Sequence, residues 1–477
     1  MDWKYALSLD LGDPGFDFTL LHDFRQRLLT HEAAQRLLDT FLTPCKARGW
    51  LKARGTQRTD STHVLAAIRT LHRVECVLEA MHAALNQLRA AEPAWVQHHV
   101  PLDWYPRDGL RSDQTRLPKD ASKREALTRQ VGADGYQLLE WVQTADTSSD
   151  LRDLPALEAL RQIWLQQYSR GTVPGLEALR WRMGDEQPPA AVRITSPYDL
   201  EARYCSKRDT HGVGYKLHLT GTCDPEQPDL ITQVITTPAT TPDGIMGPTI
   251  HHALAQRDLL PGTHLLDGGY VDADGLVTAQ RHQQIDVIGP AFGSYSWQHH
   301  TGQGYGLQAF VLDWEAQQAH CPQGHTSVHW RPGHDVSGDP VIRIRFDGAT
   351  WRACPARRMC TAAKDAPRQL TVRTQAHHEA IQAARQQQET AEFTAQYALR
   401  AGVESNLSQG VRRFDLRRSR YLGLARTHLQ QLLTATAMNV VRVIAWLRGE
   451  TLGERRRQLG HFARLSPHPL SRQTVLC

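Results

Sequence analysis

The chain has 477 residues, of which 40% are hydrophobic and 22% are charged, a composition typical of a globular protein with several structural units. It contains no run of about 18 apolar residues. Its first residues, MDWKYALSLDLGDPG, lack the apolar core of a signal peptide, so we expect no membrane span and a cytoplasmic location. The eight cysteines are scattered and do not form the framework of a disulfide-rich secreted domain.

Positive charge is concentrated near the end of the sequence. Residues 410–477 contain 13 arginines, no lysine and three carboxylates, which gives this segment a net charge of +10. Since the whole chain has a formal charge of +5, the preceding residues have −5. This asymmetry favours a polyanionic partner, most simply a nucleic acid. The alternative is an arginine-rich surface that contacts only solvent.

The first part of the chain reads mainly as helix. Residues 16–48 keep apolar residues three and four apart, which predicts helix. Residues 64–88 do the same and predict a long amphipathic helix that ends at Pro93. The segment RTDSTHV (58–64) precedes this second helix. Its hydroxyl residues and Asp60 are all of the kind that caps a helix N-terminus.

The chain changes character after mostly helical material over 100–185 and a linker at 184–192. Alternating apolar residues then predict a hairpin, and a short helix and two apolar strands follow it. These elements are expected at 212–224, 229–239, 247–257, 262–267 and 285–291. Their β-β-α-β order, with Asp267 at a strand end, predicts a mixed α/β fold.

The last third of the chain contains three further predicted parts. Residues 292–373 are rich in Gly, His and Trp with short apolar runs, which favours an inserted β-rich module. A strong helix is expected over 376–404 and is followed by a basic loop. The last long helix is expected over 421–448.

Three carboxylates lie in contexts that suit catalysis as well as structure. Asp60 lies among hydroxyl residues, and Asp267 ends a predicted strand before two glycines. Glu404 follows Tyr397 and Arg400 at spacings of three and four, so the three side chains would share one helix face. Such a face suits phosphate and metal together, because a carboxylate binds a hard cation and a guanidinium binds a phosphate oxygen. Taken singly, the three also have ordinary explanations: a helix cap, a turn and a surface ion pair.

The sequence resembles the DDE transposases of bacterial insertion sequences, most closely the insertion-sequence group called eleven-eighty-two. The resembling stretches span nearly the whole chain and include RTDSTHVLAAIRTLHRVE (58–75), ITSPYDLEARYCSKR (194–208), GYKLHLTGTCD (214–224), HLLDGGYVDADGLV (264–277), IGPAFGSYSWQ (288–298), CPQGHTSVHW (321–330) and YALRAGVESNLSQGVRRFDLRRSRYLGLARTHLQ (397–430). The wider clan has the signature Tyr-x2-Arg-x3-Glu-x6-Lys. Tyr397, Arg400 and Glu404 match it, whereas Val411 occupies the lysine position, so the resemblance does not identify which neighbouring arginine contacts DNA.

The resemblance implies an α/β fold with an RNase H-like mixed-sheet core, interrupted by a helical insertion and by a β-rich, zinc ribbon-like insertion. The implied division is an N-terminal helical segment at 1–50, core strands at 51–62 and 192–291, the helical insertion at 63–191, the β-rich insertion at 292–373, the catalytic helix and basic loop at 374–420, and a C-terminal helix and basic tail at 421–477. Relatives carry a further helical segment before the part that resembles DWKYALSLDLGDPGF, so an N-terminal truncation or an upstream start is expected.

The implied activity is metal-dependent DNA transposition. Asp60, Asp267 and Glu404 would hold two Mg²⁺ (or Mn²⁺) ions about 3.5–4 Å apart, which bind the attacking and leaving oxygens. The enzyme would nick the ends of its element and join the freed 3′-hydroxyls to double-stranded target DNA. It would act as a dimer or larger assembly associated with the bacterial nucleoid and not with a membrane. The rival hypothesis is a catalytically silent or truncated DNA-binding derivative that competes for element ends; a nuclease without strand transfer is a third.

Two further groups of residues are candidates for binding. Contact with DNA phosphates is expected from Tyr397, Arg400, Arg412, Arg413, Arg417, Arg418, Arg420 and Lys216. Cys321, Cys354 and Cys360 are candidate zinc ligands in the β-rich insertion. The family's further cysteine position is Trp351 here, so a nearby histidine (His320, His325 or His329) would complete the set. The alternative is a module held by packing alone, without zinc.

Overall fold

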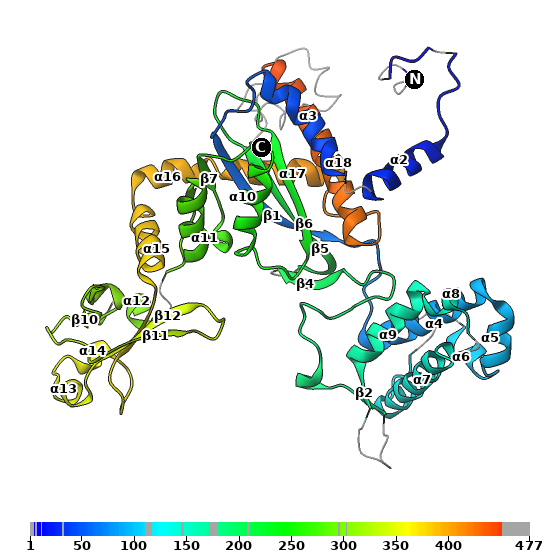
Figure 1. Cartoon of the computed structure of the whole chain (residues 1–477), viewed down its shortest axis with the longest axis horizontal. Helices are drawn as coiled ribbons and strands as arrows, with labels where there is room; N and C mark the ends of the chain where they lie inside the picture. Colours follow the sequence, from blue (N-terminus) through cyan, green and yellow to red (C-terminus); the bar gives the residue numbers. More distant parts are fainter. Residues whose placement is uncertain are drawn as a thin grey trace, which may run out of the picture.

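The structure is a computed structural model that describes residues 4, 7–10, 12–30, 33–109, 117–144, 147–170, 179–207, 210–293, 296–301 and 303–450. Figure 1 shows three parts: a central sheet flanked by helices, a helical unit at the lower right and a β-rich unit at the lower left. The predicted basic tail after residue 450 lies outside the described residues. Within the described part of the chain, no helix combines the length and the apolar character that a membrane span requires.

The central sheet is mixed. Its strands are β1 (Thr56–Leu65), β4 (Arg203–Lys207), β5 (Thr210–Thr222), β6 (Ile231–Pro238), β7 (Thr263–Leu265) and β8 (Asp286–Ile288). β5 pairs antiparallel with β1, β4 and β6, whereas β7 pairs parallel with β1 and with β8. The predicted mixed α/β architecture and the predicted hairpin, formed by β5 and β6, are therefore confirmed.

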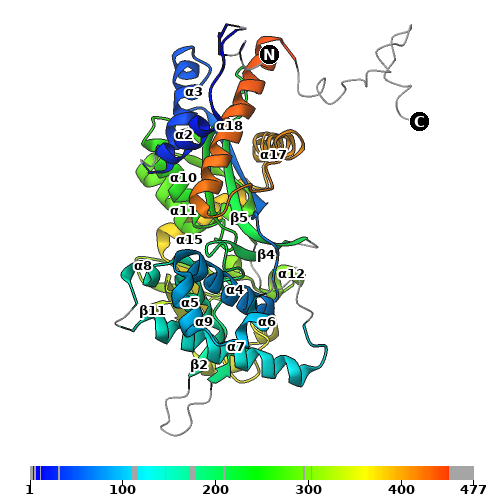
Figure 2. The same ribbon diagram turned by 90° about the vertical axis from the view of Figure 1, so that its right-hand side faces the viewer.

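Helices cover both faces of this sheet (Figures 1 and 2). They are α3 (Gln35–Ala47), α10 (Met246–Ala255), α11 (Ala273–Thr278), α15 (Gln375–Gln387), α16 (Ala391–Ala398), α17 (Ala401–Phe414) and α18 (Leu424–Leu447), and α2 (Phe18–Thr30) packs on α18. One core lies between the sheet and helices α3, α17 and α18, and includes Leu217 and Leu407. A second core lies under α10 and α11 and includes Ile250 and Leu266. The sheet therefore has a hydrophobic core on each of its faces.

The helical unit has a hydrophobic core of its own, which includes Met81, Leu138 and Trp164. Its elements are α4 (Arg73–Ala91), α5 (Pro93–His99), α6 (Trp104–Asp108), α7 (Ala121–Val142), α8 (Ser149–Arg152), α9 (Pro155–Gln167), β2 (Tyr168–Arg170) and β3 (Leu179–Trp181). The chain leaves the sheet after Leu65 and rejoins it at Arg203. Both of these residues pair with Gly214 of β5, one in β1 and one in β4.

The β-rich unit contains the short strands expected from the sequence and also three short helices that were not expected. Its elements are α12 (Trp297–Thr301), β9 (Val311–Asp313), β10 (Gln318–His320), β11 (His329–His334), β12 (Pro340–Arg345), α13 (Gly348–Ala353), α14 (Arg357–Cys360) and β13 (Gln369–Arg373). β11, β12 and β13 form an antiparallel sheet over a small core around Phe310, Ile344 and Phe346.

Most of the other predicted elements are present with shifted ends. The helices expected over 16–48, 247–257 and 421–448 are confirmed as α2 with α3, α10 and α18. The two apolar strands that follow the hairpin are confirmed as β7 and β8, each only three residues long. Asp267 therefore lies two residues beyond its strand.

The predicted helix over 64–88 is wrong in its first part. Val64 lies in β1, and α4 begins only at Arg73. Residues 57–65 all pair with β5, so cross-strand hydrogen bonds decide the conformation, and the helical spacing of the apolar residues here is coincidental. Ser61 and Thr62 are strand residues, and their predicted role as helix caps is wrong.

The predicted continuous helix over 376–404 is also wrong, because the chain forms α15, α16 and α17 in this region. Between α16 and α17, the N–H of Arg400 donates to the carbonyl of Tyr397 at 2.9 Å. This bond spans three residues where an α-helix spans four, so the helix tightens and breaks. Tyr397 and Glu404 consequently lie on different helices and do not share one face.

Buried imidazoles lie on the α10 side of the sheet. His264 Nε2 lies 2.7 Å from Thr59 Oγ1, and His264 Nδ1 lies 2.8 Å from His251 Nε2. Burial lowers the pKa of His251 to about 4 and, together with the charge of His251, lowers the pKa of His264 well below 6.5. Burial also lowers the pKa of His218 to about 4, against the opposing charge of Asp243. The folded protein therefore keeps these rings neutral.

We expect the free energy of unfolding to decrease as the pH falls from about 6.5 toward 4, because over this window the unfolded chain binds protons that the folded chain excludes. Each unit of pKa depression corresponds to about 1.4 kcal/mol. The check is urea denaturation at pH 7 and at pH 5, with His251→Gln as the comparison. The variant should show a smaller pH dependence than the unmodified chain. Equal midpoints at the two pH values in the unmodified chain would contradict this expectation.

Candidate active site

Asp60 and Asp267 lie side by side at one edge of the parallel pair of strands. Arg58 of β1 pairs with Leu265 of β7. Asp60 lies two residues after Arg58, and Asp267 lies two residues after Leu265. Each carboxylate accepts a hydrogen bond from the following backbone N–H, that of Ser61 or that of Gly268, at 2.8 Å. The carboxyl edge of a parallel pair is where α/β sheets commonly place functional groups.

Arg400 connects the two aspartates. Its Nη2 lies 3.2 Å from Asp60 Oδ2 and 3.6 Å from Asp267 Oδ2. The Arg400 and Asp60 side chains are mostly buried, whereas Asp267 is 54% exposed. A guanidinium between two carboxylates offsets their mutual repulsion and fixes their orientation. Three residues predicted from three separate segments therefore meet at one place.

Tyr397 packs beside this group. The Arg400 guanidinium carbon lies 5.8 Å from the centroid of the Tyr397 ring, which stacks on Phe393 at 5.3 Å. Burial raises the pKa of the Tyr397 phenol, Arg400 opposes this shift, and the charges of Asp267 and Asp60 add to it. At neutral pH the hydroxyl is therefore protonated and can donate a hydrogen bond to an anion.

Glu404 does not join the two aspartates in this structure. It lies exposed in the first turn of α17, one helical turn after Arg400. Among the described residues, no group of three or more His, Cys, Asp or Glu side chains is placed to hold a metal ion. The two assembled carboxylates nevertheless supply the oxygen ligands that Mg²⁺ prefers, and Mg²⁺ commonly uses one or two protein carboxylates together with substrate phosphate.

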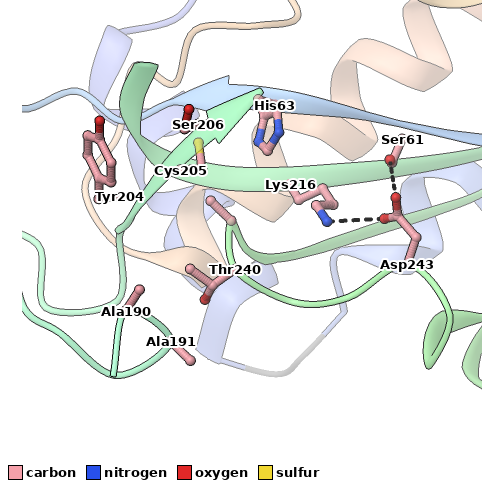
Figure 3. A pocket seen from close by; sticks show the side chains of 11 residues that line it. Ser61, His63, Ala190, Ala191, Tyr204, Cys205, Ser206, Lys216, Thr240 and Asp243 are labelled. Atoms are coloured by element: carbon pink, nitrogen blue, oxygen red, sulfur yellow. Dashed lines mark hydrogen bonds and ion pairs between the residues drawn. The ribbon is translucent and has the colours of Figure 1, made fainter. Parts of the chain in front are cut away.

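The opposite face of β1 carries a second polar group, which Figure 3 shows. Lys216, predicted to contact phosphate, forms an ion pair with Asp243 at 3.2 Å and donates to the Thr241 carbonyl at 2.6 Å. Ser61 donates to the other Asp243 oxygen at 3.2 Å. Ser61, His63, Lys216 and Asp243 line a cavity of about 480 Å³. The Lys216 ammonium is thus held by groups of the protein itself.

Tyr270 links this polar group to the aspartates. Its hydroxyl lies 2.6 Å from His218 Nδ1. Burial raises the pKa of Tyr270 well above its usual value, the charge of Asp243 adds most to this shift, and Asp60 and Asp267 add less. Sequence reasoning did not find Tyr270 or Asp243, because Tyr270 follows an Asp-Gly-Gly stretch and Asp243 lies in a Pro-Asp-Gly stretch, and both read as turns.

The predicted basic segment runs along the end of β1. Arg412 and Arg413 lie exposed in the last turn of α17 rather than in a loop. The N–H of Leu65 donates to the carbonyl of Arg417 at 2.7 Å, and Arg417 Nε donates to Thr62 Oγ1 at 2.9 Å. Arg418 and Arg420 are also exposed. Of these arginines, Arg417 contacts β1 two residues beyond Asp60.

The three candidate zinc ligands line one cavity of about 300 Å³ in the β-rich unit, together with His325. Burial raises the pKa of the Cys360 thiol. The charge of Arg368 opposes this shift, and the neighbouring Cys321 and Cys354 add to it. Trp351 is buried against the same cavity. The three thiols thus line the same cavity, but among the described residues no three His, Cys, Asp or Glu side chains are placed to bind one metal ion.

Comparison with protein families gives one match: residues 320–444 match a family model described as "Transposase DDE domain". The match supports a DDE transposase. The matched region covers roughly a quarter of the chain and contains Tyr397, Arg400 and Glu404. Asp60 and Asp267 lie outside it, yet β1 and β7 bring them to Arg400. Comparisons with curated proteins and with solved structures gave no match.

A transposase domain implies DNA as the substrate and a cutting reaction that depends on divalent metal ions. The oxygen ligands of Asp60 and Asp267, the partly buried Arg400 and the exposed arginines that follow fit both requirements.

Proposed function

We propose that this chain is a DNA transposase of the insertion-sequence group called eleven-eighty-two, which cuts the ends of its element and joins them to target DNA. The observation that carries the proposal is the contact of Arg400 with both Asp60 and Asp267. Arg400 belongs to the region that matches the transposase family, and the aspartates come from two strands outside it. An RNase H-like core is part of this proposal and is supported by the mixed sheet that carries the aspartates.

In this proposal Asp60, Asp267 and Glu404 hold two Mg²⁺ or Mn²⁺ ions, which would supply Lewis-acid stabilisation of the phosphoryl oxygens. Glu404 is included because it lies one turn after Arg400 in the exposed start of α17. We propose that the Glu404 side chain turns toward the aspartates when DNA binds, because a phosphate oxygen then contacts the Arg400 guanidinium in their place. The Tyr397 hydroxyl then donates a hydrogen bond to the same phosphate.

Two displacements at phosphorus complete the reaction. In the first, a water oxygen attacks the phosphodiester at the element end, the P–O3′ bond breaks and a 3′-hydroxyl is released. In the second, this hydroxyl oxygen attacks a target phosphodiester, and the P–O3′ bond of the target breaks as the new P–O bond forms. Each step exchanges one phosphorus–oxygen bond for another and moves a proton between oxygen atoms or to solvent, so no covalent protein–DNA intermediate is required.

The test is a Mg²⁺-dependent cleavage and strand-transfer assay on DNA that carries the element ends. Glu404→Gln removes a charge but preserves shape, and we expect it to lower cleavage by about 100-fold or more, since even outer partners of metal ligands contribute 10–100-fold. Glu392→Gln is the matched control, because Glu392 lies exposed in the first turn of α16. Equal rates for Glu404→Gln and the unmodified chain would remove Glu404 from the site.

One observation favours the rival, a DNA-binding derivative without catalysis: Glu404 is not assembled with the aspartates. The same assay separates the two hypotheses. Retained binding of element ends with no cleavage by the unmodified chain, over a range of Mg²⁺ and Mn²⁺ concentrations, would support the derivative that competes for ends.

For the basic segment we expect a salt-dependent effect on DNA affinity. Arg413→Ala and Arg418→Ala should each weaken binding, and should each lower the slope of log K against log salt concentration by about 0.9, the value for one phosphate contact. Fluorescence anisotropy with end DNA at several salt concentrations measures both quantities. Arg129→Ala is the control, since Arg129 is also exposed and lies on α7 of the helical unit. An unchanged slope in both variants would contradict phosphate contact.

The proposal also includes an assembly and a second metal. Two element ends must be held together, so we propose a dimer or larger assembly on DNA, which light scattering with end DNA tests.

We further propose a zinc ion at the cavity of Cys321, Cys354 and Cys360, supported by the three neighbouring thiols. Metal analysis of the purified chain and of Cys354→Ser tests this, and the absence of zinc from both would favour packing alone.

A further inference from the structure

Arg58 ties the candidate catalytic strand to the junction of α16 and α17. It lies two residues before Asp60 on β1 and is 6% exposed. Its Nη1 donates to the carbonyl of Leu399 at 2.6 Å, and its Nη2 pairs with the carboxylate of Asp229. Arg58 and Asp60 lie on the same side of β1 and contact successive residues, Leu399 and Arg400. The junction is therefore held at two adjacent points.

Asp229, the partner of Arg58, also binds residues of α17 and α18. Asn406 Nδ2 of α17 donates to Asp229 Oδ1 at 3.3 Å, and Arg442 Nη1 of α18 donates to the Asp229 carbonyl at 3.1 Å. Arg442 Nε also donates to Gln409 Oε1 of α17 at 2.9 Å. Asn406 and Arg442 are 2% and 5% exposed. A buried network with several partners permits few alternative arrangements, because each broken bond leaves a polar group unpaired.

Gly402 allows α17 to approach Arg58 closely. A Cβ at this position would lie 2.1 Å from Arg58 Nη1 and 2.5 Å from its guanidinium carbon. Any other residue would force the first turn of α17 and the guanidinium apart. This turn carries Glu404 and follows Arg400 directly.

We propose that Arg58 and Asp229 are positioning residues, which fix the first turn of α17 against β1 and so set the places of Arg400 and Glu404 relative to Asp60 and Asp267. The inference rests on the proposed transposase function. Neither residue touches DNA or a metal ion in this account. They act through the carbonyl of Leu399, through Asn406 and through the space left by Gly402.

The decisive variant is Gly402→Ala in the full chain, because it keeps every charged group and adds one methyl group at the contact. Gly247→Ala is the matched control, since Gly247 lies in α10 and a Cβ there would meet no atom within 4 Å. Arg58→Lys is the second variant. Lysine keeps the positive charge near Asp229 but lacks the second nitrogen that donates to the Leu399 carbonyl. This variant tests the inference if Gly402→Ala does not fold.

Two measurements are made on each variant. Hydrogen exchange should become at least tenfold faster for peptides that cover 399–406, with little change elsewhere. The Mg²⁺ concentration for half-maximal end cleavage should rise at least tenfold, which a general loss of stability would not produce. The double variant Gly402→Ala/Arg58→Lys should lose no more than the more severe single variant, because both changes act on one contact.

The outcomes separate this inference from the proposed function. Faster exchange over 399–406 supports the positioning role of Arg58 even if the unmodified chain cleaves no DNA, a result that would overturn only the transposase activity. Exchange equal to that of Gly247→Ala would overturn the inference. Faster exchange with an unchanged Mg²⁺ midpoint in an active enzyme would also overturn it, since the contact would then hold the junction without positioning the site.

Discussion

Replacing Asp60 or Asp267 with asparagine is expected to abolish measurable end cleavage, a loss of at least about 100-fold, while affinity for end DNA changes little. Asparagine preserves the size of the side chain but removes the charge that a divalent ion requires. The two substitutions should have similar effects because both carboxylates contact the same guanidinium from neighbouring strands. Single-turnover cleavage on element-end DNA gives the rates, and anisotropy gives the affinity.

Asp258→Asn is the control for this pair, because the Asp258 carboxylate is 90% exposed and lies outside the site. Thermal unfolding of each variant shows whether the fold is retained. Cleavage by Asp60→Asn at the rate of Asp258→Asn would exclude Asp60 from the chemistry and would return it to a structural role in β1.

Replacing Arg400 with glutamine is expected to change two measured quantities in opposite directions. Without DNA, the guanidinium and a divalent ion compete for the same carboxylates, so the variant should bind Mn²⁺ more tightly, by about tenfold if the contact with the half-exposed Asp267 contributes about 1.4 kcal/mol. With DNA, cleavage should fall by about 100-fold or more, because the proposed charge-assisted contact of Arg400 with phosphate is lost. Electron paramagnetic resonance of Mn²⁺ and the cleavage assay measure the two effects.

Arg400→Lys distinguishes charge from shape in this prediction. Lysine keeps the positive charge but cannot span both carboxylates with one planar group, so it should leave Mn²⁺ affinity near that of the unmodified chain and still lose cleavage. Weaker Mn²⁺ binding by Arg400→Gln than by the unmodified chain would contradict the competition, since it would show that Arg400 supports metal binding.

The strand that carries Asp60 shows why pattern reading succeeded in one place and failed in another. The β5–β6 hairpin was predictable because alternating residues are separated by a turn. The residue pattern alone did not predict β1, because Val64 and the apolar residues after it fit a helical period, and pairing with a strand about 150 residues later decides the outcome. The resemblance implied a core strand within 51–62, and β1 extends beyond that range to Leu65.

The sequence indicated residues of the candidate site but not their arrangement. Asp60, Asp267 and Arg400 were selected from the resemblance and meet in space. The break between α16 and α17 could not be read from the sequence, because Leu399 and Arg400 are good helix formers and the carbonyl of Leu399 is held by a buried partner more than 300 residues away. Asp229 gave no signal, since one carboxylate near a turn is ordinary.

The pairing of both Leu65 and Arg203 with Gly214 has a consequence for the history of this architecture. Neighbouring strands lie about 4.8 Å apart, so the two points where the helical unit joins the sheet are about 10 Å apart across β5. The unit also has its own core. Gain, loss or exchange of the helical unit during evolution would therefore leave the pairing register of the sheet unchanged. Homologues are expected to differ most in this unit, and a short loop of a few residues is enough to close the sheet in its place.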